Sequence, residues 1–87
     1  MEQPKDGITV YTKSNCFYCT KMKELFPDAH YVNCDTYLED TDEFLDFIDT
    51  LTDKNPTKFP MVFKDKEYIG GFKEAEEMVL NLKTEFH

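Results

Sequence analysis

The sequence has no excess of positive charge, no long apolar run and no even set of cysteines. Its 10 lysine and arginine residues stand against 18 aspartates and glutamates, which gives a net charge of −8. This balance argues against nucleic acid and anionic membranes as partners, because neither attracts an acidic protein. No apolar run approaches the roughly 18 residues that a membrane-spanning helix needs. Three cysteines do not fit the even-numbered disulfide framework of a small secreted protein.

The first seven residues are polar and lack the apolar core of a secretory signal peptide. Together with the odd cysteine count, this predicts a reducing, cytoplasmic location. The length of 87 residues leaves room for one domain with a modest core. Hydrophobic residues make up 40% of the chain and include eight phenylalanines and five tyrosines. We therefore expect a single folded domain over residues 1–87.

Two of the cysteines, Cys16 and Cys19, lie between a strand-like run and a helix-like run. Residues 8–12 are rich in β-branched side chains and alternate apolar with polar positions, which predicts a strand. Beyond Cys16, the apolar Cys19 and Met22 recur on one helical face, and Pro27 ends that helix. A Cys-x-x-Cys pair in this context is typical of a thiol–disulfide redox motif.

The remaining pattern supplies three more strands and two more helices. Residues 30–34 predict a second strand, and residues 61–69 predict a hairpin. Asp40 and Glu43 resemble a capping box before a helix whose outer face is acidic, and we expect that face to be solvated. The apolar positions of the last helix are Ala75, Met78, Val79, Leu82 and Phe86. The order β-α-β-α-β-β-α predicts an α/β fold, a four-stranded mixed sheet flanked by three helices.

Cys16 is the candidate nucleophile because it would lie at a helix N-terminus. Unpaired N–H groups and the helix dipole favour an anion there, and Lys13 adds a nearby positive charge. These effects could lower the thiol pKa from about 8.5 into the range of roughly 3.5–7.5 known for such cysteines. Cys19, one turn further on, would face the core and resolve the mixed disulfide. At this spacing the two Cα atoms can lie within the roughly 4.4–6.8 Å that a disulfide requires.

A zinc site is the alternative interpretation of the same cysteines. Cys16, Cys19, His30 and Cys34 have the residue types and spacing of a four-ligand set. The predicted strand would place His30 and Cys34 awkwardly for this role, so the redox interpretation is favoured. Cys34 alone is better explained as a small residue at a strand end than as a functional thiol.

Three segments, taken in order, resemble dithiol glutaredoxins. Residues 11–19 look like the family's active-site segment, here with Cys-Phe-Tyr-Cys in place of the usual Cys-Pro-Tyr-Cys. Phe59-Pro60 resembles the Val-Pro before the family's third strand, and residues 69–72 resemble its Gly-Gly signature. The resemblance extends over residues 8–82, nearly the whole chain. It implies a thioredoxin-like fold and glutathione as the co-substrate, with no resident metal.

The resemblance also implies which residues contact glutathione. Pro60 would follow a cis peptide bond, the backbone of Phe59 would pair with the cysteine of glutathione, and Tyr18 would flank the reacting sulfur. Lys13 would meet the glycine carboxylate, and the γ-glutamyl carboxylate would bind the amides that open the last helix. The complete set is Lys13, Tyr18, Phe59, Pro60, Gly71, Phe72 and Lys73.

The chain departs from the family pattern at three places. Phe17 replaces the common proline and restores a backbone N–H, and we expect it to alter thiolate stability and loop rigidity. Lys58 stands where threonine is usual and could add a second cation for glutathione. Lys73-Glu74 replaces a Ser or Asp followed by Asp, so the contact to the γ-glutamyl amino group is the least secure of those implied.

The function implied is that of a glutathione-dependent thiol–disulfide oxidoreductase, or thioltransferase, acting as a monomer. Cys16 would attack protein disulfides or glutathione mixed disulfides, Cys19 would resolve protein mixed disulfides, and glutathione would restore the dithiol. Substrates would be disulfide-containing or glutathionylated proteins; ribonucleotide reductase is one that only the resemblance suggests. An alternative is a dimer that holds a [2Fe–2S] cluster through the first cysteine and glutathione, an option raised by Phe17. Further alternatives are electron supply from thioredoxin reductase and, last, a non-enzymatic acidic adaptor.

Overall fold

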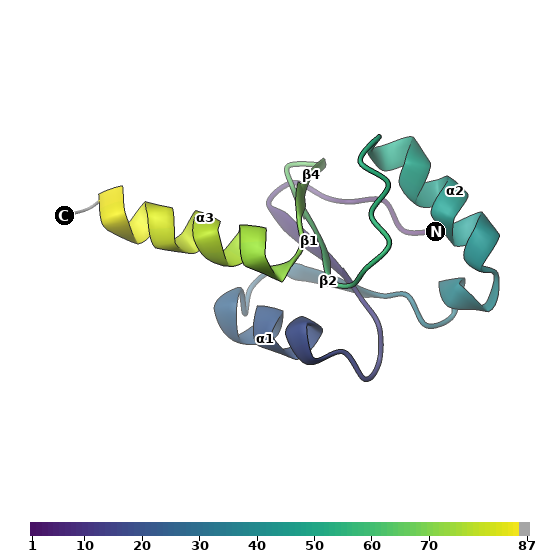
Figure 1. Cartoon of the computed structure of the whole chain (residues 1–87), viewed down its shortest axis with the longest axis horizontal. Helices are drawn as coiled ribbons and strands as arrows, with labels where there is room; N and C mark the ends of the chain where they lie inside the picture. Colours follow the sequence, from purple (N-terminus) through teal and green to yellow (C-terminus); the bar gives the residue numbers. More distant parts are fainter. Residues whose placement is uncertain (86–87) are drawn as a thin grey trace.

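The computed structural model describes residues 1–85, and side chains are described for residues 1–81. Phe86, assigned above to the apolar face of the last helix, therefore lies outside the described residues, as does the side chain of Leu82. The elements follow the predicted order, with one short 3₁₀ helix (η1) in addition (Figure 1). They are β1 Ile8–Thr12, α1 Phe17–Leu25, β2 His30–Asn33, η1 Tyr37–Glu39, α2 Thr41–Leu51, β3 Met61–Lys64, β4 Glu67–Gly70 and α3 Phe72–Glu85.

The four strands form one mixed sheet in the order β2-β1-β3-β4. β1 and β2 are parallel, whereas β3 is antiparallel to both β1 and β4. Parallel neighbours need a crossover connection, and α1 provides it. The predicted α/β architecture with a four-stranded mixed sheet is confirmed.

Helices cover both faces of the sheet. On one face, Met22 of α1 and Ala75 of α3 pack with Val10 and Val62 of the central strands. On the other face, α2 contributes Phe44 and Ile48 to a larger cluster formed by Tyr11, Val32, Cys34, Met61 and Phe63. All of these core side chains are at most 4% exposed. The sheet therefore buries apolar side chains on both of its faces, which gives the chain one hydrophobic cluster on each side.

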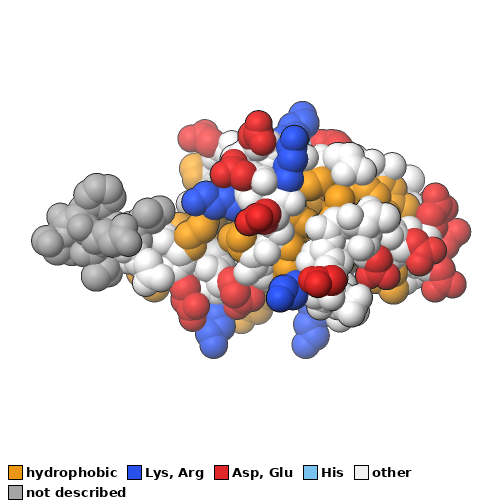
Figure 2. Space-filling view, turned by 90° about the horizontal axis from the view of Figure 1, so that it is seen from above, with side chains coloured by type: hydrophobic (Ala, Val, Ile, Leu, Met, Phe, Trp, Pro, Cys, Tyr) orange, Lys and Arg blue, Asp and Glu red, His pale blue; other side chains and the backbone are white. Residues whose placement is uncertain are grey.

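The acidic face of α2 is exposed, as expected. Asp40 is the N-cap of this helix, and its carboxylate accepts a hydrogen bond of 3.1 Å from the N–H of Glu43. Carboxylates gather at the end of the molecule that α2 forms, on the right of Figure 2. The exposed acidic residues of this helix are Asp42, Glu43, Asp46 and Asp49.

The strand register gathers the predicted site at one end of the sheet. Thr12 of β1 pairs with Asn33 of β2, so both parallel strands end on this side. Met61 at the start of β3 pairs with Tyr11, and Gly70 at the end of β4 pairs with Val62. The segments that follow β1 and β2, precede β3 and follow β4 therefore meet at this edge. None of the helices within residues 1–85 is long and apolar enough to cross a membrane.

Candidate active site

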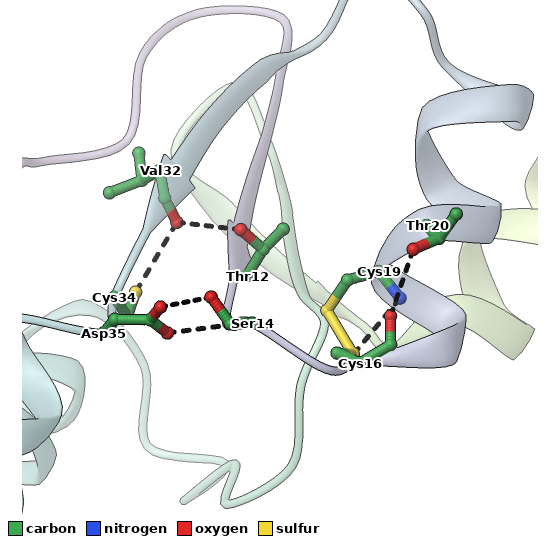
Figure 3. The surroundings of a disulfide bond; sticks show 8 residues. All are labelled: Thr12, Ser14, Cys16, Cys19, Thr20, Val32, Cys34 and Asp35. Carbon is green, nitrogen blue, oxygen red and sulfur yellow. Dashed lines mark hydrogen bonds between the residues drawn. A yellow bond between two sulfur atoms is a disulfide. The ribbon is translucent and has the colours of Figure 1, made fainter.

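Cys16 is the N-cap residue of α1, and Cys19 lies in the first turn of this helix. The two residues are joined by a disulfide with a Cα–Cα distance of 5.2 Å, within the range predicted for the pair (Figure 3). Cys19 is only 4% exposed, whereas Cys16 is half-buried at the surface. The prediction that Cys19 faces the core is confirmed, and Cys16 is the more accessible sulfur.

The helix N-terminus provides the environment that a thiolate requires. The backbone N–H of Cys19 donates a hydrogen bond of 3.2 Å to Sγ of Cys16. The Cys16 sulfur therefore occupies the position of a capping side chain, where it satisfies one of the donors that a helix leaves unpaired at its start. When the disulfide is reduced, the same N–H and the helix dipole favour the anionic form of this sulfur.

A cavity of about 660 Å³ lies beside the pair. It is lined by all the predicted glutathione-contacting residues except Lys13: Tyr18, Phe59, Pro60, Gly71, Phe72 and Lys73. The peptide bond between Phe59 and Pro60 is cis, as the resemblance implied. The ring of Tyr18 contacts that of Phe72, with centroids 5.2 Å apart, so α1 and α3 meet at the wall of the cavity. Lys58 also lines this space.

Lys13 does not line this cavity. It lines a second cavity of about 470 Å³, together with Cys16 and Cys19. The structure thus places Lys13 with the cysteines but apart from the residues that line the larger cavity. Its side chain is exposed.

Glu74 has a role that the sequence analysis did not assign. Its carboxylate accepts a hydrogen bond of 2.9 Å from the backbone N–H of Gly71, and it lines the larger cavity. The amides of Gly71, Phe72 and Lys73 were predicted to bind a carboxylate of glutathione, and an internal carboxylate already holds the first of them. The available signal was a glutamate three residues after Gly71, which is the capping-box spacing.

The zinc alternative does not form within residues 1–85. His30 contacts the carboxylate of Glu2 through its Nε2 atom. Cys34 is fully buried, and its thiol lies 3.6 Å from the carbonyl oxygen of Val32. Desolvation raises the pKa of the Cys34 thiol to about 12, so this side chain remains neutral. In the described part of the chain, no three His, Cys, Asp or Glu side chains are grouped to hold a metal ion.

The comparisons with known proteins agree with this geometry. The glutaredoxin family model matches residues 8–69, more than half of the chain, and the protein therefore belongs to the glutaredoxin family. No curated protein sequence matches the chain.

Solved structures of glutaredoxins share its fold. Glutaredoxin 1 from Francisella tularensis, complexed with cacodylate, is 26% identical with a TM-score of 0.70; the match covers 86% of this chain and 96% of that one. The holo form of glutaredoxin C1 from Populus tremula x tremuloides is 24% identical (TM-score 0.67, covering 87% and 76%). A buckwheat glutaredoxin–glutathione complex is 23% identical (TM-score 0.68, covering 90% and 72%). The fold is thioredoxin-like, and family and fold support thiol–disulfide oxidoreductase chemistry at the Cys16–Cys19 pair.

Proposed function

We propose that this protein is a glutathione-dependent thiol–disulfide oxidoreductase that reduces protein disulfides and glutathione mixed disulfides. The observation that carries the proposal is the Cys16–Cys19 disulfide at the start of α1, in which Sγ of Cys16 accepts a hydrogen bond from the backbone N–H of Cys19. A thiolate held in this way is the nucleophile that disulfide exchange requires.

Reduction of a glutathione mixed disulfide needs only Cys16. Its thiolate attacks the glutathione sulfur, a new S–S bond forms, and the protein thiolate leaves with the electron pair and takes a proton from water. A second glutathione thiolate then attacks the glutathione sulfur of this mixed disulfide. Oxidised glutathione leaves, and the Cys16 thiolate is restored.

Reduction of a protein disulfide uses both cysteines. The Cys16 thiolate first attacks one sulfur of the substrate disulfide. A Cys16–substrate S–S bond forms as the substrate S–S bond breaks, and the other substrate sulfur leaves as a thiolate and takes a proton from water. Cys19 then loses its proton and attacks Sγ of Cys16, which releases the substrate dithiol and leaves the Cys16–Cys19 disulfide. Two glutathione molecules reduce this disulfide in turn and leave as oxidised glutathione. The Cα–Cα distance of 5.2 Å supports this step, because the pair reaches the bonded geometry at the start of an intact helix.

The larger cavity is the proposed binding site for glutathione. Its lining by Tyr18, Phe59, Pro60 and Phe72 supports this, and the buckwheat relative of the same fold is a complex with glutathione. The backbone of Phe59 would pair with the glutathione cysteine. The amides of Phe72 and Lys73, which open α3, would bind the γ-glutamyl carboxylate.

Lysines line both the proposed site and the neighbouring cavity. Lys58 and Lys73 line the larger cavity, and Lys13 lies beside Cys16 in the neighbouring one. An anionic tripeptide that bridges from Cys16 into the larger cavity would meet positive charge at both positions. The contact of Lys13 with the glycine carboxylate belongs to this proposal.

The test is a glutathione-coupled assay on the wild type and three cysteine variants. Cys16→Ser should abolish turnover of every substrate, and Cys19→Ser should retain activity on a glutathionylated peptide but lose reduction of a protein disulfide. Cys34→Ser is the matched control, because this buried thiol has no part in the reaction, and it should retain both activities. Equal loss in the Cys16 and Cys19 variants would contradict the division of roles. Full turnover with thioredoxin reductase in place of glutathione would contradict the glutathione dependence.

Several finer expectations belong to the same proposal. The substrates would be disulfide-containing or glutathionylated proteins, with ribonucleotide reductase as one candidate, and the protein would act in the cytoplasm as a monomer. The [2Fe–2S] alternative rests on Phe17 and the family resemblance, and no observation within residues 1–85 favours it. Visible absorption after anaerobic reconstitution with iron, sulfide and glutathione tests it directly.

A further inference from the structure

Asp35 connects the loop that carries Cys16 to the end of β2. Its Oδ1 atom accepts a hydrogen bond of 2.9 Å from the backbone N–H of Ser14, and its Oδ2 atom accepts one from the Ser14 hydroxyl (Figure 3). The backbone N–H of Asp35 in turn donates to the side-chain oxygen of Asn33, over 2.9 Å. The carboxylate is therefore held in place, and it accepts two hydrogen bonds from Ser14.

The loop over residues 13–15 needs such an anchor. Just beyond β2, the N–H of Cys34 donates a hydrogen bond of 2.8 Å to the carbonyl of Thr12, the last residue of β1. Beyond it the chain leaves the sheet and, after Asn15 in a left-handed conformation with φ of 57°, reaches Cys16 at the N-cap of α1. Among the described residues, the hydrogen bonds that tie this loop to another segment both end on Asp35.

The charge of Asp35 agrees with its role as a double acceptor. The hydrogen bond from the Ser14 side chain, then that from its backbone N–H, and the charge of Lys13 hold the pKa of this carboxyl below its usual range. Asp35 is therefore ionised at neutral pH, when the cysteine pair works. An ionised carboxylate accepts from two donors at once, which a neutral side chain of the same size does less well.

We propose that Asp35 is a positioning residue for Cys16. Through its two hydrogen bonds to Ser14, it holds the loop that places Sγ of Cys16 at the N-terminus of α1 and Lys13 beside it. Asp35 does not touch the reacting sulfurs; it acts through the loop. Nucleophilic attack on a disulfide depends on geometry, and small displacements of the attacking atom reduce the rate strongly. This inference rests on the proposed disulfide exchange, but its first test does not involve glutathione.

The test compares two substitutions of Asp35 that separate its hydrogen bonds to Ser14 from its charge. Asp35→Asn keeps an oxygen for the Ser14 N–H and a second polar atom for the hydroxyl, but removes the charge. Asp35→Ala removes both the hydrogen-bonding atoms and the charge. The first readout is the pH profile of the alkylation of reduced Cys16 by iodoacetamide, followed by mass spectrometry. The second is the KM and kcat for a glutathionylated peptide.

Loss of the loop anchor should weaken the contact of Cys16 with the helix N-terminus. Asp35→Ala should therefore move the alkylation profile to higher pH and lower kcat/KM roughly tenfold, mainly through kcat. In Asp35→Asn, the alkylation profile of Cys16 should stay at the wild-type pH or move to lower pH, and kcat should stay within about twofold of the wild type. Asp49→Ala, which removes an exposed aspartate of α2, is the control and should match the wild type.

Two results would overturn the inference. If both Asp35 variants moved the profile to lower pH, Asp35 would act only as a nearby negative charge. If neither variant moved it, the loop would hold Cys16 without this carboxylate. Should Asp35→Ala fail to fold, Ser14→Ala removes one of the two hydrogen bonds and should give a smaller shift in the same direction. A shifted alkylation profile in a protein without glutathione-dependent turnover would retain the positioning role and refute the proposed function.

Discussion

The backbone N–H of Cys19 donates a hydrogen bond to Sγ of Cys16 over 3.2 Å. The residue that we propose as the resolving thiol thus also contributes to the environment of the nucleophile. Its own side chain is only 4% exposed, and helix packing keeps it away from solvent. Two cysteines three residues apart therefore have different surroundings, which arise from the start of one helix.

These surroundings predict an order of thiol reactivity in the reduced protein. At neutral pH, iodoacetamide should label Cys16 fastest and Cys19 slowly, and it should leave Cys34 unlabelled. Cys34 is fully buried, and desolvation raises the pKa of its thiol to about 12. Mass spectrometry of a digest after timed labelling measures the order. Protein unfolded in urea is the control, because all three cysteines should then react at similar rates; native-state labelling of Cys34 as fast as that of Cys16 would refute the prediction.

The buried Cys34 thiol also makes stability depend on pH in the alkaline range. In the unfolded chain a cysteine thiol has a pKa of about 9.0, whereas burial in the folded protein raises the pKa of Cys34 to about 12. Above about pH 9 the unfolded state therefore binds fewer protons than the folded state, and the free energy of unfolding falls as the pH rises. The added slope is at most about 1.4 kcal/mol per pH unit for one proton.

Urea titrations of the wild type and Cys34→Ala between neutral and alkaline pH measure this slope. Burial also raises the pKa of Tyr11, so both proteins should lose stability at high pH. The difference between the two curves isolates Cys34: the wild type should lose stability more steeply than the variant. Parallel curves would show that the Cys34 thiol ionises equally easily in the folded protein.

Local sequence pattern was sufficient to predict the fold. The periodic Phe44 and Ile48, with Asp40 at the cap, mark α2 because a helix that buries one face must repeat its apolar residues at that spacing. Cys16 and Cys19 were equally accessible to sequence reasoning, because their contact is made within one helical turn. Each of the two helices, α1 and α2, begins after a residue whose side chain caps it: Cys16 for α1 and Asp40 for α2. Capping is also a local property.

The contacts that sequence reasoning missed depend on how the elements meet. Ser14 and Asp35 are 21 residues apart and touch because β1 and β2 are parallel and end at the same edge of the sheet. Lys13 lines a different cavity from Phe59, because the position of Lys13 depends on the path of the loop between two elements. Neither relationship has a spacing that could be recognised in the chain alone.

A side chain at Gly70 is predicted to destabilise the folded protein, for two separable reasons. Its φ of 134° is a conformation that side chains disfavour, and a Cβ at this position would lie 2.6 Å and 2.8 Å from two side-chain carbons of Glu74. Gly70→Ala should therefore lower the free energy of unfolding by about 1–3 kcal/mol. It should also displace the Glu74 carboxylate from the N–H of Gly71.

A double-mutant cycle separates the two causes. If the clash contributes, Gly70→Ala should cost less in a Glu74→Ala background than in the wild type, because the obstructing side chain is gone and only backbone strain remains. Urea unfolding of the four proteins measures the coupling. Gly7→Ala is a control for positive φ without a clash: the φ of Gly7 is 81°, and its Cβ would meet no atom within 4 Å. An equal cost of Gly70→Ala in the wild-type and Glu74→Ala backgrounds would refute the role of Glu74.

Phe17 is the residue at which this chain departs from the usual active-site proline, and the structure indicates that proline fits there. Phe17 is the first residue of α1, where proline is favoured because its missing N–H has no intrahelical partner. Cys16 before it has φ of −117° and ψ of 109°, an extended conformation that a following proline accepts. Phe17→Pro should therefore fold. The restricted unfolded chain should add about 0.4–1 kcal/mol to the free energy of unfolding, partly offset by the lost ring contacts with Tyr18 and Lys21.

The same substitution tests whether Phe17 tunes the redox pair. Proline removes the backbone N–H of the residue that follows Cys16 and stiffens the chain there, so we expect both the alkylation profile of Cys16 and the reduction potential of the pair to change. Redox titration against glutathione buffers measures the potential. Thr20→Pro is the control for the position, because the N–H of Thr20 donates to the carbonyl of Cys16 over 3.2 Å, and its loss inside the helix should cost about 3 kcal/mol or more. A Phe17→Pro protein with the wild-type profile and potential would show that the phenylalanine is a surface substitution without effect on the chemistry.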